Sequence, residues 1–179
     1  MRKLIVQELV SIDGFFSGSK GEIDWHHVDD EYDDYAINFL NSVDVLLFGR
    51  VTYQLMMGHW PTASGEIAHK MNTLPKIVFT KTLEKVDWQF TRLVKENIIE
   101  EIKNLKQQPG KDLAILGSAN LASYLMNAGL VDEYQLTVIP VVLGNGRPLF
   151  KDIRGKIYMK LLKSNTFRSG SVQFFYQPQ

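Results

Sequence analysis

The chain has 179 residues, and its 20 Lys and Arg residues balance its 20 Asp and Glu residues. This balance argues against a nucleic-acid-binding domain, which is typically strongly basic. The absence of Cys excludes a disulfide scaffold, a thiolate metal site and a cysteine nucleophile, and it fits a protein of the reducing cytoplasm. The N-terminus lacks a signal-peptide pattern and no apolar run reaches about 18 residues, so we expect one globular domain and no membrane span.

Short apolar runs alternate with helical patterns along the chain. The pattern predicts strands at 3–12, 43–49, 76–80, 112–117 and 134–144, and helices at about 30–42, 50–58, 64–72, 95–107 and 118–129. Two more strands surround Arg168-Ser169-Gly170. Ser118 is expected to cap the helix that it starts, and Gly129 to end it.

Strands separated by helices need crossover connections and therefore lie parallel. The order predicts an α/β fold, in which helices flank both faces of a mostly parallel sheet that ends in an antiparallel hairpin. In such sheets, ligands bind at the carboxyl ends of the strands.

Two glycine-containing turns lie at such strand ends. Gly49-Arg50 follows the strand at 43–49, and Gly117-Ser118-Ala119-Asn120 follows the strand at 112–117. A glycine before a helix N-terminus lets a phosphate approach free N–H groups and the positive end of the helix dipole. Each turn alone is more typical of a plain strand-to-helix connection, but a dinucleotide can use both. Thr80 and Lys81 end another strand and suit a ribose 2′-phosphate, although Lys81 also suits a solvated turn.

The predicted helix at 30–42 is rich in acids at its start. Helical geometry places Asp33 at the border of its apolar arc, where partial desolvation is expected, and Asp30 and Asp34 on the polar face. Asp33 could then bind ring N–H and amino groups or help to deliver a proton. The alternative is that these acids complement the helix dipole.

Other polar residues give weaker signals. The four histidines lack metal-ligand spacing and indicate surface or loop positions, so we expect no metal site. Trp60 could close a pocket over a flat ring or pack within a loop. Ser118 and Ser123 lack a base and an acid for serine hydrolysis.

Several segments together resemble one superfamily. They are Ser11-Ile12-Asp13-Gly14, LLFGRVTY at 46–53, KIVFTK at 76–81, and the long segment at 112–150 with its GS-x-x-L, GLVDEY and P-x-x-LGNGRPLF motifs. The chain resembles the dihydrofolate-reductase-like superfamily. Within it, the chain is most similar to the C-terminal reductase domain of the bifunctional riboflavin-biosynthesis deaminase/reductase and its stand-alone bacterial relatives.

This resemblance implies a single domain over residues 1–179, a sheet of about eight strands, bound NADPH and a homodimer. It implies phosphate contacts at Gly49, Arg50 and Thr52, and adenosine ribose contacts at Thr80 and Lys81. It also implies pyrophosphate contacts at Gly117, Ser118, Ala119, Asn120 and Leu121, and a nicotinamide-side loop at Asp13 and Gly14. The acid that binds the pterin in folate reductases corresponds to Asp33, or to Asp30 when the count starts from Trp25.

The resemblance therefore implies an NADPH-dependent reductase of a small heterocyclic substrate like 5-amino-6-(5-phosphoribosylamino)uracil. Dihydrofolate reduction is the second possibility, although Ile23-Asp24-Trp25 stands where folate reductases have Leu-Pro-Trp. A non-catalytic NADP-binding module is the third. No deaminase half with a zinc-binding His/Cys set is present.

Overall fold

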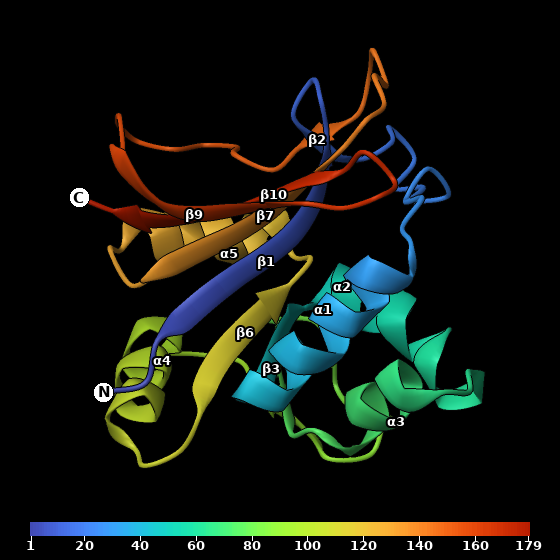
Figure 1. The fold of residues 1–179 in the computed structure, drawn as a ribbon. Helices are drawn as coiled ribbons and strands as arrows, with labels where there is room; N and C mark the ends of the chain where they lie inside the picture. Colours follow the sequence, from blue (N-terminus) through green and yellow to red (C-terminus); the bar gives the residue numbers. More distant parts are fainter.

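The computed structural model describes residues 1–179 and is built around an eight-stranded sheet (Figure 1). The strand order is β5-β4-β3-β6-β1-β7-β10-β9. Every strand except β10 runs parallel to the others, because β10 pairs antiparallel with both β7 and β9. The strands are β1 (Leu4–Ser11), β3 (Val43–Gly49), β4 (Lys76–Phe79), β5 (Thr91–Val94), β6 (Asp112–Leu116), β7 (Glu133–Ile139), β9 (Met159–Thr166) and β10 (Val172–Pro178).

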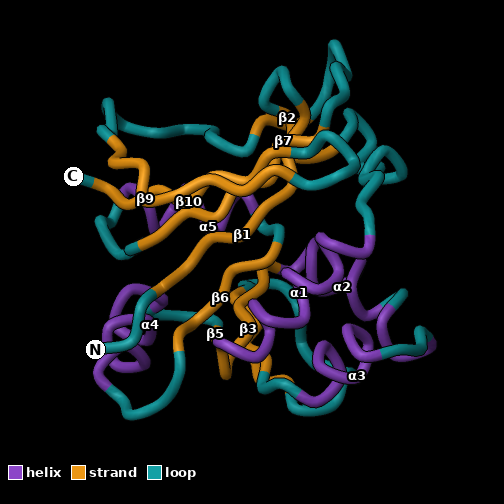
Figure 2. Tube along the Cα trace, in the orientation of Figure 1, coloured by secondary structure: helices purple, strands orange, loops and turns teal.

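Five α-helices and one short 3-10 helix flank this sheet, as the tube view shows (Figure 2). They are α1 (Asp30–Ser42), α2 (Arg50–Met57), η1 (Trp60–Thr62), α3 (Glu66–Thr73), α4 (Ile98–Gln107) and α5 (Ala119–Asn127). Side chains of α1, α2 and α3 form one core cluster, whereas side chains of α4 and α5 form another. The expected α/β fold with a mostly parallel sheet and a C-terminal antiparallel hairpin is confirmed.

The two core clusters lie on opposite faces of the sheet, and β1 contributes to both. Leu4 and Val6 belong to the cluster with α4 and α5, and Ile5 belongs to the cluster with α1. Successive side chains of a strand point to opposite faces. The alternation therefore places Gln7 on the α1 face and Glu8 on the α5 face.

Three short strands were not predicted from the sequence. One is β5, and the others are β2 (Phe15–Ser17) and β8 (Arg147–Pro148), which pair as a separate antiparallel sheet. Pairing between segments about 130 residues apart leaves no local periodicity, so the pattern of either segment alone could not show it.

The end of α5 follows the sequence prediction. Gly129 has a φ of +66°, and the N–H groups of Gly129 and Leu130 donate to the carbonyl oxygens of Met126 and Leu125. A left-handed residue after the helix satisfies carbonyl groups that the helix leaves unpaired. Elsewhere, no helix of the structure combines the length and apolar character that a membrane crossing requires.

Candidate functional site

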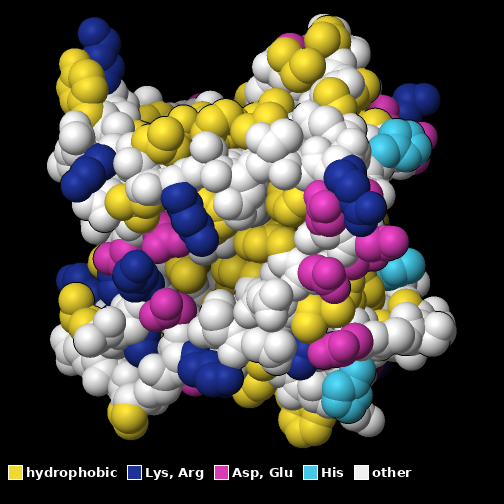
Figure 3. Space-filling model, viewed as in Figure 1, with side chains coloured by type: hydrophobic (Ala, Val, Ile, Leu, Met, Phe, Trp, Pro, Cys, Tyr) yellow, Lys and Arg dark blue, Asp and Glu magenta, His cyan; other side chains and the backbone are white.

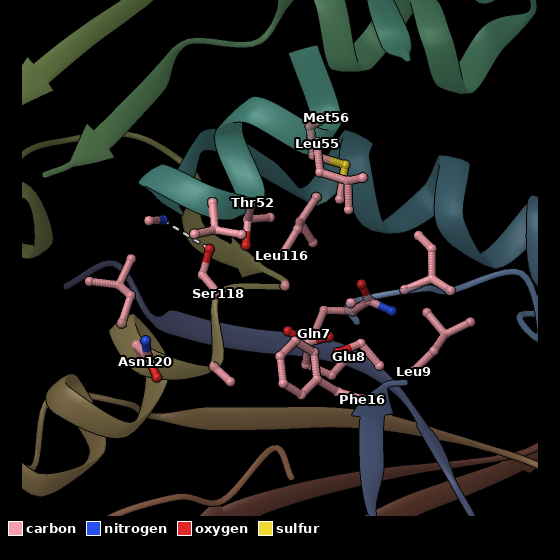
Figure 4. Close-up of a pocket in the computed structure, with 18 of the residues that line it drawn as sticks. Gln7, Glu8, Leu9, Phe16, Thr52, Leu55, Met56, Leu116, Ser118 and Asn120 are labelled. Atoms are coloured by element: carbon pink, nitrogen blue, oxygen red, sulfur yellow. Dashed lines mark hydrogen bonds between the residues drawn. The ribbon is translucent and has the colours of Figure 1, made fainter. Parts of the chain in front are cut away.

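Two neighbouring strands end in turns that touch each other. Strands β3 and β6 are adjacent in the sheet, β3 continues into α2 at Gly49-Arg50, and β6 continues into α5 at Gly117-Ser118. The N–H group of Gly49 donates to Ser118 Oγ at 2.9 Å, which Figure 4 marks as a dashed line. The two predicted turns therefore form one unit at the carboxyl end of the sheet.

The expected capping role of Ser118 is wrong. Ser118 adopts a left-handed conformation with a φ of +66°, and its side chain makes no hydrogen bond to α5 because it accepts from Gly49 instead. No side chain caps α2 either. The first N–H groups of both helices therefore remain available to an anionic group.

Gly117 allows this arrangement for two reasons. Its φ is +64°, a region that favours glycine, and a Cβ added there would lie 2.8 Å from Thr52 Cγ2 of α2. The close approach of the second turn to α2 therefore excludes any side chain at this position.

A cavity of about 1510 Å³ opens beside these turns. That volume exceeds the roughly 300–1,000 Å³ of most small-molecule pockets, so a dinucleotide and a second small molecule can share it. Twelve of the fourteen site residues predicted from the sequence lie along its wall. They are Asp33, Gly49, Arg50, Thr52, Trp60, Thr80, Lys81, Gly117, Ser118, Ala119, Asn120 and Leu121.

Asp13 and Gly14 are the two predicted residues outside this wall. The Asp13 carboxylate accepts hydrogen bonds from Ser11 Oγ at 2.6 Å and from the N–H groups of Gly144 and Leu143 at 2.8 and 3.1 Å. The bond from Ser11, assisted by the two backbone bonds, lowers the pKa of Asp13 below its ordinary value. In this structure Asp13 joins the loop after β1 to the loop after β7.

The strand β1 has an open edge at the cavity. It pairs with β6 from Leu4 to Gln7, but it pairs with β7 as far as Ser11. Past Gln7 no strand covers the β6 side, so backbone groups of the following residues face the cavity region unpaired. This gap gives a flat ligand a place beside the sheet with N–H and C=O groups along its edge.

Two predicted polar residues hold other contacts at the cavity wall. Thr80 Oγ1 accepts from the N–H groups of Thr82 and Leu83 at 3.2 and 3.1 Å, which orders the turn carrying the exposed Lys81. Trp60 Nε1 lies 3.1 Å from Met56 Sδ, and Trp60 borders the cavity between α2 and α3.

The structure separates the two candidate acids of α1. Asp33 lines the cavity and Asp30 does not. Asp33 is exposed, so the partial desolvation expected at the border of the apolar arc is absent. Acidic side chains gather over the start of α1 (Figure 3), where Asp29 caps the helix by accepting from the N–H of Tyr32 at 3.0 Å. The dipole interpretation therefore applies to Asp29, and Asp33 alone of these acids reaches the cavity.

Sequence analysis missed two groups in the cavity wall. Glu8 of β1 is 6% exposed, its carboxyl group has no hydrogen-bond partner in the chain, and burial raises its pKa to about 8. His26 lies in a loop, which is one of the two positions expected for the histidines, but its Nε2 atom is enclosed without a partner, and burial lowers its pKa to about 4. Figure 4 shows Glu8 beside Gln7 and Phe16, across the cavity from Thr52 and Leu55 of α2.

The cavity also gathers more positive charge than the sequence could assign to it. Lys20, Arg147 and Lys151 line it together with Arg50 and Lys81, and all five side chains are exposed at its rim. Arg154 does not line the cavity. No group of three His, Asp or Glu side chains is arranged to hold a metal ion.

Comparison with known proteins identifies the family of the chain. The family model of the RibD C-terminal domain matches residues 2–173. The chain belongs to the RibD C-terminal domain family. Among relatives, the uncharacterized protein YyaP of Bacillus subtilis (strain 168) is 38% identical over 98% of this chain and 94% of its own length.

Solved structures share the fold at lower identity. A Shewanella sp. PV-4 protein, named as a candidate for riboflavin biosynthesis, aligns with a TM-score of 0.80, 22% identity and 99% coverage of both chains. A Thermotoga maritima diaminohydroxyphosphoribosylaminopyrimidine deaminase/5-amino-6-(5-phosphoribosylamino)uracil reductase aligns at 0.72 and 14% identity, over 99% of this chain and 57% of its own. The Enterococcus faecalis dihydrofolate reductase complexed with NADP(H) aligns at 0.68 and 16% identity, over 99% and 96%. These likenesses confirm the dihydrofolate-reductase-like fold. The match to the family model confirms the relationship to the RibD C-terminal domain.

Proposed function

We propose that the protein is an NADPH-dependent reductase that transfers hydride to a C=N or C=O bond of a small heterocyclic or sugar-linked substrate. The observation that carries the proposal is the single cavity that joins two uncapped helix N-termini to the open edge of β1. A RibD reductase relationship supports the reaction class, and the named neighbours that reduce a phosphoribosylaminouracil or bind NADP(H) support the ligands.

The residues present fit a dinucleotide. The turn at Gly117 has no room for a side chain without a shift of Thr52, and the N–H groups at the starts of α2 and α5 can donate hydrogen bonds to two phosphate groups. Arg50 and Lys81 add positive charge on the side of β3 and β4, where Lys81 suits a 2′-phosphate. NADPH would supply the hydride, while these side chains bind and orient the cofactor.

The substrate side lies between α1 and the open edge of β1. Asp33 is the acid that would hold N–H groups of the substrate ring, and Trp60 contributes a flat apolar surface at the other wall. Lys20 and Arg147 at the rim suit a phosphorylated substrate like 5-amino-6-(5-phosphoribosylamino)uracil. Dihydrofolate is the second candidate substrate, which the shared fold of the Enterococcus faecalis enzyme favours.

The test measures NADPH oxidation with each of these two substrates, and the binding of NADPH and NADH. Lys81→Ala should weaken NADPH binding by about tenfold and leave NADH nearly unchanged, because it removes one charge partner of the 2′-phosphate. Asp33→Asn should lower turnover by about 100-fold without affecting NADPH binding. The matched controls are Lys85→Ala and Asp30→Asn, which lie outside the cavity wall.

Equal weakening of both cofactors by Lys81→Ala would refute the 2′-phosphate role. NADPH binding without turnover of either substrate would instead favour a non-catalytic NADP-binding module. Turnover of dihydrofolate alone would select the second candidate substrate.

Homodimer formation remains a proposal from the family resemblance. The tail strand β10 lies inside the sheet between β7 and β9, so it is not free to pair with a second copy. The edge strand β9 is exposed, and Leu161 and Leu162 are exposed apolar residues in it. We propose this edge as the contact between two copies, and sedimentation velocity measures the association.

A further inference from the structure

Glu8 lies where β1 leaves its neighbour. The paired segment of β1 and β6 ends at Gln7 opposite Leu116, so Glu8 is the first residue of β1 beyond it. Residues on both sides of Glu8 also line the cavity, namely Gln7 and Leu9. Alternation along the strand separates their side chains, and Gln7 Nε2 is already committed to Tyr32 Oη at 2.9 Å on the α1 face.

The Glu8 carboxyl group has no partner that would explain its burial. It forms no hydrogen bond within the chain, its Oε1 atom is enclosed, and the residue is 6% exposed. An unpaired buried carboxylate is strongly unfavourable, so such a group holds its proton instead. Burial is the sole cause that raises the pKa of Glu8 to about 8, and the group is therefore a neutral acid at pH 7.

None of the charged and titratable groups around the cavity forms a hydrogen bond or an ion pair with the Glu8 carboxyl group. Three titratable side chains of α1 line the cavity, namely Tyr32, Asp33 and Tyr35, and Tyr124 of α5 lines it as well. Two histidines, His26 and His59, line it from loops. The helix α5 carries no charged side chain, and Glu133 of β7 is paired with Lys3 at 3.0 Å. The cations of the cavity are the exposed rim residues Lys20, Arg50, Lys81, Arg147 and Lys151.

We propose that Glu8 is the acid that protonates the substrate during reduction, an inference that rests on the proposed reductase function. Reduction of a C=N or C=O bond needs a hydride and a proton. The hydride, with its electron pair, forms the new C–H bond, and the π electrons of the double bond move to nitrogen or oxygen. The Glu8 O–H bond breaks as its proton forms the new N–H or O–H bond. NADPH becomes NADP⁺, and the Glu8 carboxylate regains a proton from water.

Asp33 cannot replace Glu8 in this step. Asp33 is exposed in the first turn of α1, whereas the Glu8 carboxyl group is enclosed in the cavity wall. The two acids therefore have separate roles, because Asp33 holds the substrate ring by hydrogen bonds and Glu8 donates a proton to it.

The experiment compares the wild-type protein with Glu8→Gln, using NADPH and the two candidate substrates. Glu8→Gln keeps the shape and removes the transferable proton, so the single-turnover rate at pH 7 should fall by about 100-fold while NADPH binding stays within about threefold. The wild-type rate should fall about tenfold per pH unit above pH 8. Infrared spectroscopy supplies a readout without turnover, since the wild type should show a carboxylic acid C=O band that disappears above pH 8 and is missing in Glu8→Gln.

The matched control is Glu133→Gln, a buried glutamate of β7 outside the cavity wall, which should leave rate and pH profile unchanged. A Glu8→Gln rate within about threefold of the wild type, with the same pH profile, would overturn the role of Glu8 and leave the reductase function intact. An infrared spectrum with no Glu8 acid band at pH 7 would overturn it as well. Absence of NADPH oxidation with both substrates would overturn the reductase function and, with it, this inference.

Discussion

Buried polar side chains have partners at one end of the central sheet and lack them at the other. At the amino-terminal ends of the strands, every buried cation is paired. Lys76 Nζ donates to the carbonyl oxygens of Leu74, Met71 and Asn72 at 2.6, 2.9 and 3.3 Å, Arg2 pairs with Asp44, and Lys106 pairs with Asp132 at 2.6 Å. At the carboxyl-terminal ends, Glu8 and His26 keep buried polar atoms without any partner.

The difference separates structural polar groups from groups reserved for a ligand. Lys76 donates all three of its N–H groups to carbonyl oxygens at the end of α3, where the last carbonyl groups of a helix have no partner within the helix. Glu8 has the same degree of burial and no such use. A buried polar group that the fold does not satisfy costs stability, so its presence at a cavity indicates a role outside the fold.

The largest expected effect on stability concerns Lys76, at the end of the sheet where buried polar groups have partners. Lys76→Met keeps the volume of the side chain but leaves three buried carbonyl groups without a donor, so the free energy of unfolding should fall by about 3 kcal/mol. Chemical denaturation measures this change, and Lys85→Met at an exposed position is the control. A change below about 0.5 kcal/mol would show that water satisfies these carbonyl groups.

Replacement of Glu8, which lacks a partner, should change the stability in the opposite direction. The folded-state pKa of Glu8 lies near 8, above its ordinary value, so the stability linked to its proton is complete below about pH 4 and is lost as the pH rises through 8. Glu8→Gln removes this loss, so the amount by which its free energy of unfolding exceeds that of the wild type should grow by about 2 kcal/mol between pH 6 and pH 8. Urea denaturation at pH 6, 7 and 8 tests the trend, and parallel curves for the two proteins would contradict it.

The smallest expected effect concerns the close contact between Gly117 and Thr52 beside the cavity. Gly117→Ala and Gly129→Ala share the cost of a left-handed alanine, about 1 kcal/mol, because both φ values are near +65°. An added Cβ meets Thr52 at Gly117 and nothing within 4 Å at Gly129. Gly117→Ala should therefore cost about 1 kcal/mol more and weaken NADPH binding, whereas Gly129→Ala should leave binding unchanged.

Much of the fold could be predicted because its elements carry local signals. The apolar run Val43–Gly49 is buried between two strands, and the acids of α1 mark its start. The strands β2, β5 and β8 could not be predicted, because they are only two to four residues long. In addition, β2 and β8 pair with each other across a large separation in sequence.

The site could be predicted where chemistry follows a strand end, as at Gly49 and Gly117. Glu8 could not, because VQELV reads as an ordinary strand, and a single acid in a strand usually faces water. Its burial depends on where β6 stops, which is a property of two segments more than 100 residues apart. His26 gives no signal for the same reason, since a loop sequence does not show which of its side chains the fold encloses.

The hydrogen bond between Gly49 N–H and Ser118 Oγ has a consequence for selectivity. It fixes the distance between the starts of α2 and α5, so the two turns that we propose to bind phosphate groups have a set spacing. A ligand with two anionic groups at the matching spacing gains both turns at once, whereas one with a single phosphate gains one. This hydrogen bond would therefore make the site select ligands by the distance between their anionic groups, which neither turn could do alone.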